Sequence, residues 1–128
     1  MDCPDCESPT VAFDVPAEYA EYVPGSESAV ALCTHCLALH PTEEGAADPD
    51  FTRVSKGFPD GEAAVPFALL LGLLGNLALY REEIAALLAA VERAGTDPLL
   101  AIDRLARAPD IDATADLSGR RRQLERLL

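Results

Sequence analysis

Apolar and polar side chains alternate over residues 10–15, the first patterned stretch of the chain. Val11, Phe13 and Val15 lie on one side of a two-residue period, which is typical of a strand with one buried face. Pro16 follows, and because proline lacks the N–H that a strand ladder needs, we expect the strand to end there.

A second strand is predicted for residues 29–32, where four apolar residues lead directly into Cys33. Between the two strands, residues 17–28 contain a Pro-Gly pair and are expected to form a loop. Residues 41–50 are acidic and contain Gly and Pro, so they are predicted to form another loop. Residues 51–54 are the candidate for a last strand.

Residues 65–79 are apolar on every side except at Asn76, and Pro66 lies where the first turn of a helix tolerates proline. A membrane-spanning helix over residues 63–80 is one explanation. Pro66, two glycines and acidic flanks with no Lys or Arg before the segment favour a buried core helix instead, with no membrane contact. The pattern leaves open whether residues 63–80 form one helix or two.

The chain from Leu77 onward has the spacing of amphipathic helices. Gly95 is expected to end the first of them. Thr96 or Asp97 can cap the second, with Pro98 just inside it.

A last helix is predicted to start at about Asp116 or Ser118, and a Gly- and Pro-containing turn separates the two halves of the chain. The predicted fold class is therefore α+β, with a small antiparallel sheet in residues 1–57 and a domain of three to four helices in residues 58–128. The apolar faces of the last three helices are formed by Leu77, Tyr80, Ile84, Leu87, Leu88 and Val91, by Leu99, Ile102 and Leu105, and by Leu117, Leu124 and Leu128.

The charge is strongly acidic, with a formal net charge of −12 in 128 residues of which 49% are hydrophobic. Residues 1–60 carry twelve acidic residues against Arg53 and Lys56, so most of the excess lies in the N-terminal half. Lys56 is the only lysine, and this scarcity beside the acidity indicates adaptation to a salt-rich cytoplasm, with an ordinary acidic protein as the alternative. The first 30 residues lack a secretory pattern, so we expect a cytoplasmic location and reduced thiols.

The four cysteines form two Cys-x-x-Cys pairs, Cys3 with Cys6 and Cys33 with Cys36. Each pair presents two thiolates at a separation that fits half of a tetrahedral zinc site. The two predicted strands would return the second pair to the first. We therefore predict one structural Zn²⁺ bound by all four thiolates, which leaves no open coordination position for catalysis.

Redox chemistry, disulfides and an iron–sulfur centre are the alternatives for these cysteines. A redox pair needs a thiolate at a helix N-terminus, and no helix is predicted after Cys6 or Cys36. His35 and His40 are further candidate ligands. Because four cysteines already complete a tetrahedral set, we expect both histidines to lie outside it.

About the first 55 residues resemble a zinc ribbon whose first knuckle has the pattern Cys-Pro-x-Cys, here residues 3–6 (CPDC). Such knuckles commonly have Gly after the second cysteine, where a positive φ is convenient, whereas Glu7 and Leu37 occupy these positions here. The whole chain, with a ribbon and an arginine-capped helical tail in an acidic, lysine-poor background, is similar to small uncharacterised haloarchaeal proteins. The resemblance implies the ribbon and its zinc but no activity.

The last predicted helix contains a basic cluster, at Arg120, Arg121, Arg122 and Arg126. These side chains can contact nucleic-acid phosphates, an acidic partner or the chain's own acidic half, and they also complement the helix dipole. No aromatic platform lies near them in the sequence, so nucleic-acid binding is not favoured.

No group of residues in the sequence pairs a nucleophile with a base, so we expect no enzyme activity. We interpret the chain as a zinc-stabilised interaction or adaptor protein with a protein partner, and a homodimer through the helical domain would be one way to cover its apolar faces. A nucleic-acid or ribosome-associated factor that uses the arginine cluster is the alternative.

Overall fold

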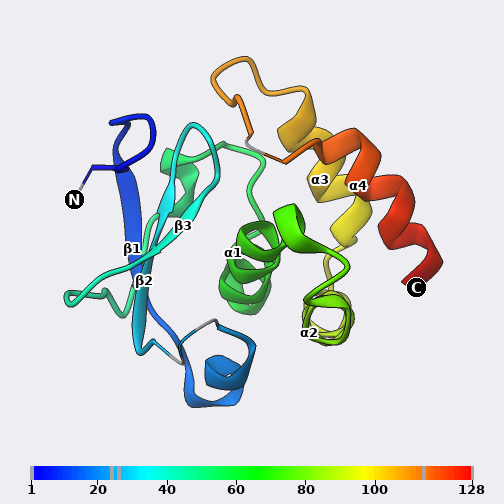
Figure 1. The fold of residues 1–128 in the computed structure, drawn as a ribbon, viewed down its shortest axis with the longest axis horizontal. Coiled ribbons are helices and arrows are strands. Elements are labelled where there is room, and N and C mark those ends of the chain that lie inside the picture. Colours follow the sequence, from blue (N-terminus) through cyan, green and yellow to red (C-terminus); the bar gives the residue numbers. More distant parts are fainter. Residues whose placement is uncertain (1, 24, 26, 114, 128) are drawn as a thin grey trace.

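The computed structural model describes residues 2–23, 25, 27–113 and 115–127. Its N-terminal part is an antiparallel sheet in the order β1-β2-β3, and its C-terminal part is helical (Figure 1), so the predicted α+β class is confirmed. The strands are β1 (Thr10–Asp14), β2 (Ala29–Cys33) and β3 (Leu39–Pro41).

The register of the sheet places the two cysteine pairs at one end of it. Thr10 pairs with Cys33 and Asp14 with Ala29, so the start of β1 lies beside the end of β2. β2 is the central strand and all five of its residues are buried, which explains why its sequence is continuously apolar rather than alternating.

The prediction of a strand over residues 51–54 is wrong. This segment forms the 3-10 helix η3 (Phe51–Arg53), because the Asp50 side chain accepts a hydrogen bond from the Thr52 backbone N–H at 3.1 Å and caps the turn. The third strand is β3, which was not predicted because three residues are too few to show a period. The loop expected before β2 contains a further 3-10 helix, η1 (Ala17–Tyr22).

The helical half follows the predicted order, with changes at one boundary. Of residues 63–80, Ala63 ends a short 3-10 helix and the rest form one α-helix followed by a 3-10 helix and a turn, and the amphipathic helix expected from Leu77 begins at Arg81. The elements are η4 (Gly61–Ala63), α1 (Ala64–Leu73), η5 (Leu74–Asn76), α2 (Arg81–Arg93), α3 (Pro98–Ala106), α4 (Leu117–Leu124) and η6 (Glu125–Leu127).

The predicted start signals of the last two helices are confirmed. The Asp97 side chain accepts hydrogen bonds from the first turn of α3, and the Asp116 side chain accepts one from Gly119 N–H at the start of α4. Gly95 has a φ of 92° just after α2, a conformation that glycine adopts without strain. Leu128, predicted on the apolar face of the last helix, lies outside the described residues.

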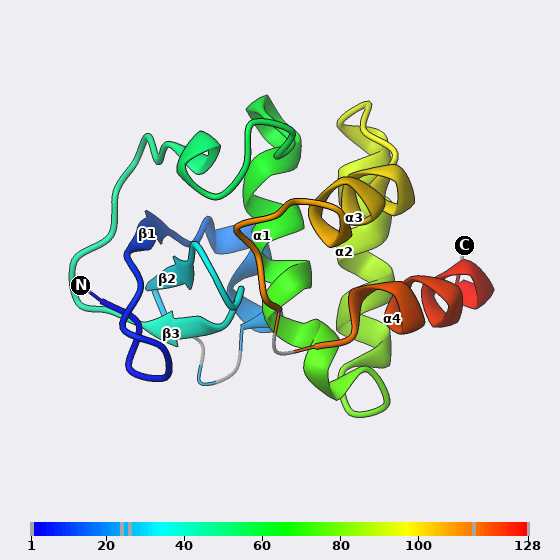
Figure 2. The same cartoon turned by 90° about the horizontal axis from the view of Figure 1, so that it is seen from above.

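Helix α1 lies between the sheet on one side and the other helices on the opposite side (Figure 2). Eight of its ten residues are buried, which explains why its sequence is apolar all round and confirms the predicted buried helix. Across the residues that the structure describes, no helix has the length and apolarity needed to cross a bilayer.

Side chains from both halves pack into one apolar cluster, which includes Phe13 and Leu32 from the sheet and Phe67 and Leu124 from the helices. The division of the chain at residues 57 and 58 stays a prediction. The shared cluster nevertheless fixes the sheet, and with it the cysteine pairs, against the helices.

Candidate metal centre

The cysteines lie in two loops at the same end of the sheet, which we call the first knuckle (residues 3–8) and the second knuckle (residues 33–38). The two loops have the same backbone turn, because in each the N–H of the first cysteine donates to the carbonyl oxygen five residues later. The bonds run from Cys3 to Ser8 at 2.8 Å and from Cys33 to Ala38 at 2.9 Å.

The residue after the second cysteine of each knuckle has a left-handed backbone. Glu7 has a φ of 63° and Leu37 a φ of 61°, and these are the positions where the resembling knuckles commonly have Gly. A left-handed conformation costs an L-residue roughly 1–2 kcal/mol. Both knuckles therefore adopt the turn despite the residue type, and something else must offset its cost.

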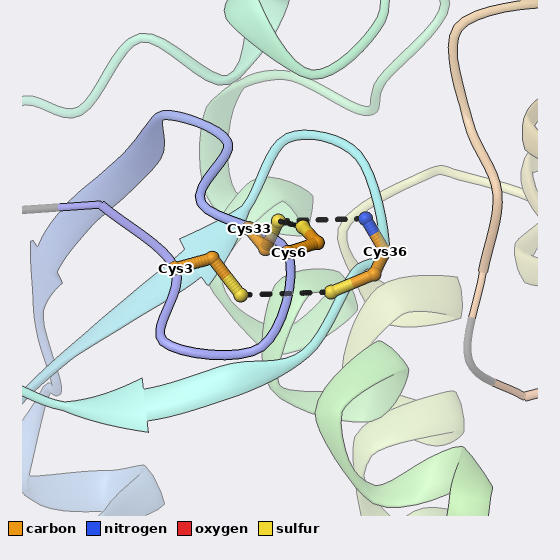
Figure 3. Close-up of side chains that lie close together, drawn as sticks. All are labelled: Cys3, Cys6, Cys33 and Cys36. Carbon is orange, nitrogen blue, oxygen red and sulfur yellow. Dashed lines mark hydrogen bonds between the residues drawn. The ribbon is translucent and has the colours of Figure 1, made fainter.

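The four Sγ atoms all lie within 4.8 Å of one another. The four side chains face one another, two from each knuckle (Figure 3), with Sγ–Sγ distances of 3.7 Å for Cys3 and Cys36 and 3.4 Å for Cys6 and Cys33. A tetrahedral ion with Zn–S bonds of ~2.3 Å holds its sulfurs about 3.8 Å apart. All four cysteines are free thiols, so their arrangement is compatible with one metal site.

Two backbone hydrogen bonds favour the thiolate form of Cys33, a fully buried cysteine. Cys33 is fully buried, and its Sγ accepts hydrogen bonds at 3.4 Å from the backbone N–H groups of His35 and Cys36. Cys3 and Cys36 are also buried, and Cys6 is partly exposed. Backbone donors of this kind compensate for water that the buried sulfur has lost.

The pKa values of the thiols differ across the centre. Burial raises the pKa of Cys36 to about 12 and also raises the pKa of Cys33, whereas hydrogen bonds with the side chain and backbone of Ser8 lower the pKa of Cys6 to about 6. Two of the four groups thus resist ionisation by themselves. A bound cation removes that resistance, because coordination deprotonates a thiol outright.

A redox pair is a weaker explanation of the same residues. Cys6 combines partial exposure with a lowered pKa, as a reactive thiol does, but its neighbour Cys33 is fully buried with a raised pKa. Within the described residues, strands rather than helices follow both knuckles. The dipole that activates redox cysteines is therefore missing from this part of the chain.

His40 reaches the centre from β3. Its Nε2 lies 3.5 Å from Cys3 Sγ and 3.8 Å from Asp5 Oδ2, and these three side chains form a second group in which ligand atoms lie within 4.8 Å of one another. Asp5 is 68% exposed, which makes it a poorer ligand than the buried thiols. Asp5 was not predicted here, although its place inside the first Cys-x-x-Cys is the signal that could have identified it.

His35 turns away from the centre and joins it to the helical half. Its ring Nδ1 lies 2.7 Å from the backbone oxygen of Asp110, and its own carbonyl oxygen accepts a hydrogen bond from Asp112 N–H at 2.9 Å. The second knuckle is thereby attached to the segment between α3 and α4.

The four arginines of the predicted patch differ in their contacts and exposure. Arg121 lies 2.7 Å from the Asp103 carboxylate and also contacts Glu125, whereas Arg120 donates to Gln123 Oε1 at 3.0 Å. Arg122 and Arg126 are exposed. The role of this patch as an interaction site stays a prediction.

A small antiparallel sheet, a helical half and a cluster of four thiols together define an α+β protein with a site compatible with one metal ion. The family model described as "Family of unknown function (DUF6276)" matches residues 2–128, and the chain belongs to this family. No curated protein and no solved structure matches the chain.

Proposed function

We propose that the cysteine centre is a structural zinc-ribbon site and that the protein is a non-enzymatic, zinc-stabilised adaptor. The observation that carries this proposal is the donor set: four thiols, three of them buried, point at a common centre from two matching knuckles. Four protein thiolates complete a tetrahedron around Zn²⁺ and leave it no water to activate. The metal then stabilises the fold instead of taking part in a reaction.

Metal analysis of the purified full chain tests the metal. We expect one zinc per chain, released by acid together with four titratable thiols. Iron in the same amount, or no metal with readily oxidised cysteines, would contradict the zinc assignment.

Cobalt substitution tests whether the site is closed. A tetrathiolate Co²⁺ spectrum should not change when azide or imidazole is added, because no coordination position is free. A spectral change would indicate an open, catalytic type of site and would contradict the non-enzymatic role.

The acidic, lysine-poor composition supports the part of the proposal that places the protein in a salt-rich cytoplasm, of the kind found in haloarchaea. On this proposal the midpoint of thermal unfolding rises between 0.15 M and 2 M KCl, because salt screens the mutual repulsion of a chain with net charge −12. A midpoint that falls over this range would contradict it. Chemical cross-linking in 2 M KCl, followed by mass spectrometry, would identify the partner.

A further inference from the structure

A groove in the helical half is lined by arginines from two segments that are far apart in the sequence, the start of α2 and the continuous stretch of α4 and η6. It has a volume of about 240 Å³ and is lined by residues of the turn before α2, of the start of α2 and of α4 and η6. Its basic residues are Arg81 at the start of α2, Arg120 in α4 and Arg126 in η6. The remaining lining residues are Leu77, Ala78, Gln123 and Leu127.

Among the described residues, no carboxylate lies within ion-pair distance of the three arginines of this groove. The hydrogen bonds of Arg120 to described residues go to neutral groups, to Gln123 Oε1 at 3.0 Å and to the Gly75 carbonyl oxygen at 3.5 Å. Those two bonds hold one guanidinium in place without neutralising its charge.

A cluster of arginines without a described carboxylate at ion-pair distance is unusual in a chain that has 22 acidic and 10 basic residues. Arg121 shows the ordinary outcome, since it is engaged by Asp103 and Glu125. An arginine cluster without lining carboxylates in such a chain therefore indicates a site for an external anion.

The apolar side chains beside the arginines indicate which class of anion the groove would bind. Leu79 is 72% exposed, next to Ala78 of the groove, and Leu77 and Leu127 line it half-buried. An aliphatic side chain of a ligand would find contacts here that a free phosphate would not use.

The basic surface continues along α4. A second hollow of about 410 Å³ shares Arg120, Gln123 and Arg126 with the groove and adds Arg122, together with one carboxylate, Asp116. The joint surface has room for several residues of an extended chain.

Nucleic acid fits this surface less well than an acidic peptide. None of the residues that line either hollow is aromatic, so bases would find no ring to stack on. Carboxylates match the fork of a guanidinium as well as phosphates do, and the leucines favour a chain that also carries aliphatic side chains.

We infer that the groove formed by Leu77, Arg81, Arg120, Arg126 and Leu127 binds an acidic segment of a partner protein, with carboxylates on the arginines and an aliphatic side chain against the leucines. The inference rests on the proposed adaptor function and specifies the surface that carries it.

Fluorescence anisotropy with the metal-loaded full chain tests the groove. The probe is a labelled, end-capped twelve-residue peptide of Glu and Leu, compared with the same peptide in which Gln replaces Glu and with a labelled twelve-nucleotide thymidine strand. We expect the acidic peptide to bind at least about tenfold more tightly than either.

Variants of the groove localise the binding. Arg81→Ala and Arg126→Ala should each lower the affinity for the acidic peptide several-fold. The double variant should abolish binding of the peptide, whereas Arg126→Lys should retain most of the affinity. Arg53→Ala, which removes one exposed arginine from the N-terminal half, is the matched control and should bind as the unchanged chain does. Metal content and circular dichroism check that each variant is folded.

Each other outcome overturns the inference. Absence of peptide binding, equal binding of the Gln peptide or unchanged binding by the double variant would exclude an acidic-peptide groove, and tighter binding of the thymidine strand would assign the surface to nucleic acid. In all these cases a chain that still holds one zinc leaves the structural metal site in place. A chain without zinc contradicts the proposed function whatever the peptide does.

Discussion

The knuckle end of the sheet and the region around α1 are both buried, but different interactions hold them. In α1, which packs against α2 and β3, large side chains such as Phe67, Leu69 and Leu70 are fully buried. At the knuckles, Leu37 joins the main apolar cluster, and the separate buried cluster consists of the cysteines with Ala38 against it. Apolar burial stabilises by about 25 cal/mol per Å², and the knuckles have little apolar area to bury. On the proposed function, a bound cation takes the place of an apolar core at that end.

Removal of one thiol should have the largest effect. Cys33→Ser deletes the fully buried ligand, and we expect the chain to lose its zinc and its free energy of unfolding to fall by on the order of 5 kcal/mol, because metal affinity at such sites is folding free energy. Metal analysis and denaturant unfolding measure both. Ala38→Ser, which adds a hydroxyl in the same knuckle and keeps four thiols, is the control. A Cys33→Ser chain of normal stability would remove the distinction between the two regions.

A cavity in the apolar region should be nearly as costly but should leave the metal bound. Phe67 is fully buried and its ring lies edge-on to Phe58 at a centroid distance of 5.3 Å. Phe67→Ala should lower the free energy of unfolding by about 3–5 kcal/mol. Leu79→Ala, at a side chain that is 72% exposed, should change it little. If Phe67→Ala released the zinc from the folded chain, the two regions would not be independent.

The contact between α1 and β3 joins the two regions, and one glycine permits it. A Cβ at Gly72 would lie 2.7 Å from Leu39 Cβ, so Gly72→Ala must displace the strand or the helix. We expect a loss of about 1–3 kcal/mol. Gly75→Ala is the matched control, since a Cβ there meets nothing within 4 Å. Equal unfolding midpoints for the two variants would show that this contact is loose.

Loss of the His40 ring should affect the metal more than the fold. Its Nε2 lies 3.5 Å from Cys3 Sγ and can donate to that thiolate, which orients it. His40→Ala should speed zinc transfer to a chelator by about tenfold, the lower end for such partners. His35→Ala, in which the ring that contacts the Asp110 carbonyl is removed, should leave the transfer rate nearly unchanged. A rate unaffected by His40→Ala would exclude this role.

The smallest expected effect is a gain. Glu7 is exposed and has a φ of 63°, so Glu7→Gly removes its backbone strain at the cost of a more flexible unfolded chain. The net gain should be about 0.5 kcal/mol. Glu7→Ala removes the same carboxylate, keeps the strain and should give no gain in denaturant unfolding. A gain of the same size in both variants would assign the effect to charge.

Much of the fold was predictable because its signals are local. Alternation around Phe13, the caps at Asp97 and Asp116 and the all-round apolar α1 each depend on neighbours in the sequence, and each is found in the structure. The errors concern segments whose conformation depends on distant contacts. Phe51 looked like part of a strand but packs on Phe13 at a ring distance of 5.2 Å from a capped 3-10 turn.

In the candidate site, too, the local features were predictable from the sequence and the features that depend on distant contacts were not. The spacing of the cysteines was enough to group all four, since each pair is a local turn and a hairpin returns the second to the first. The approach of His40 to Cys3 was not predictable, because it depends on β3, an unpredicted strand. The convergence of Arg81 with Arg120 and Arg126 was also beyond the sequence, because the packing of separate helices creates it.

The sequence by itself determined β1, β2 and the α-helices, the four thiols and the acidic balance of charge, since these depend on residue type and short spacing. Only the tertiary structure decided which arginines pair with a described carboxylate, which histidine lies against the cysteines and how α1 becomes buried on both sides. The physical reason is that the chemistry of each side chain is given by its residue type. Burial and ion pairing, in contrast, depend on which distant segments pack together and exclude water.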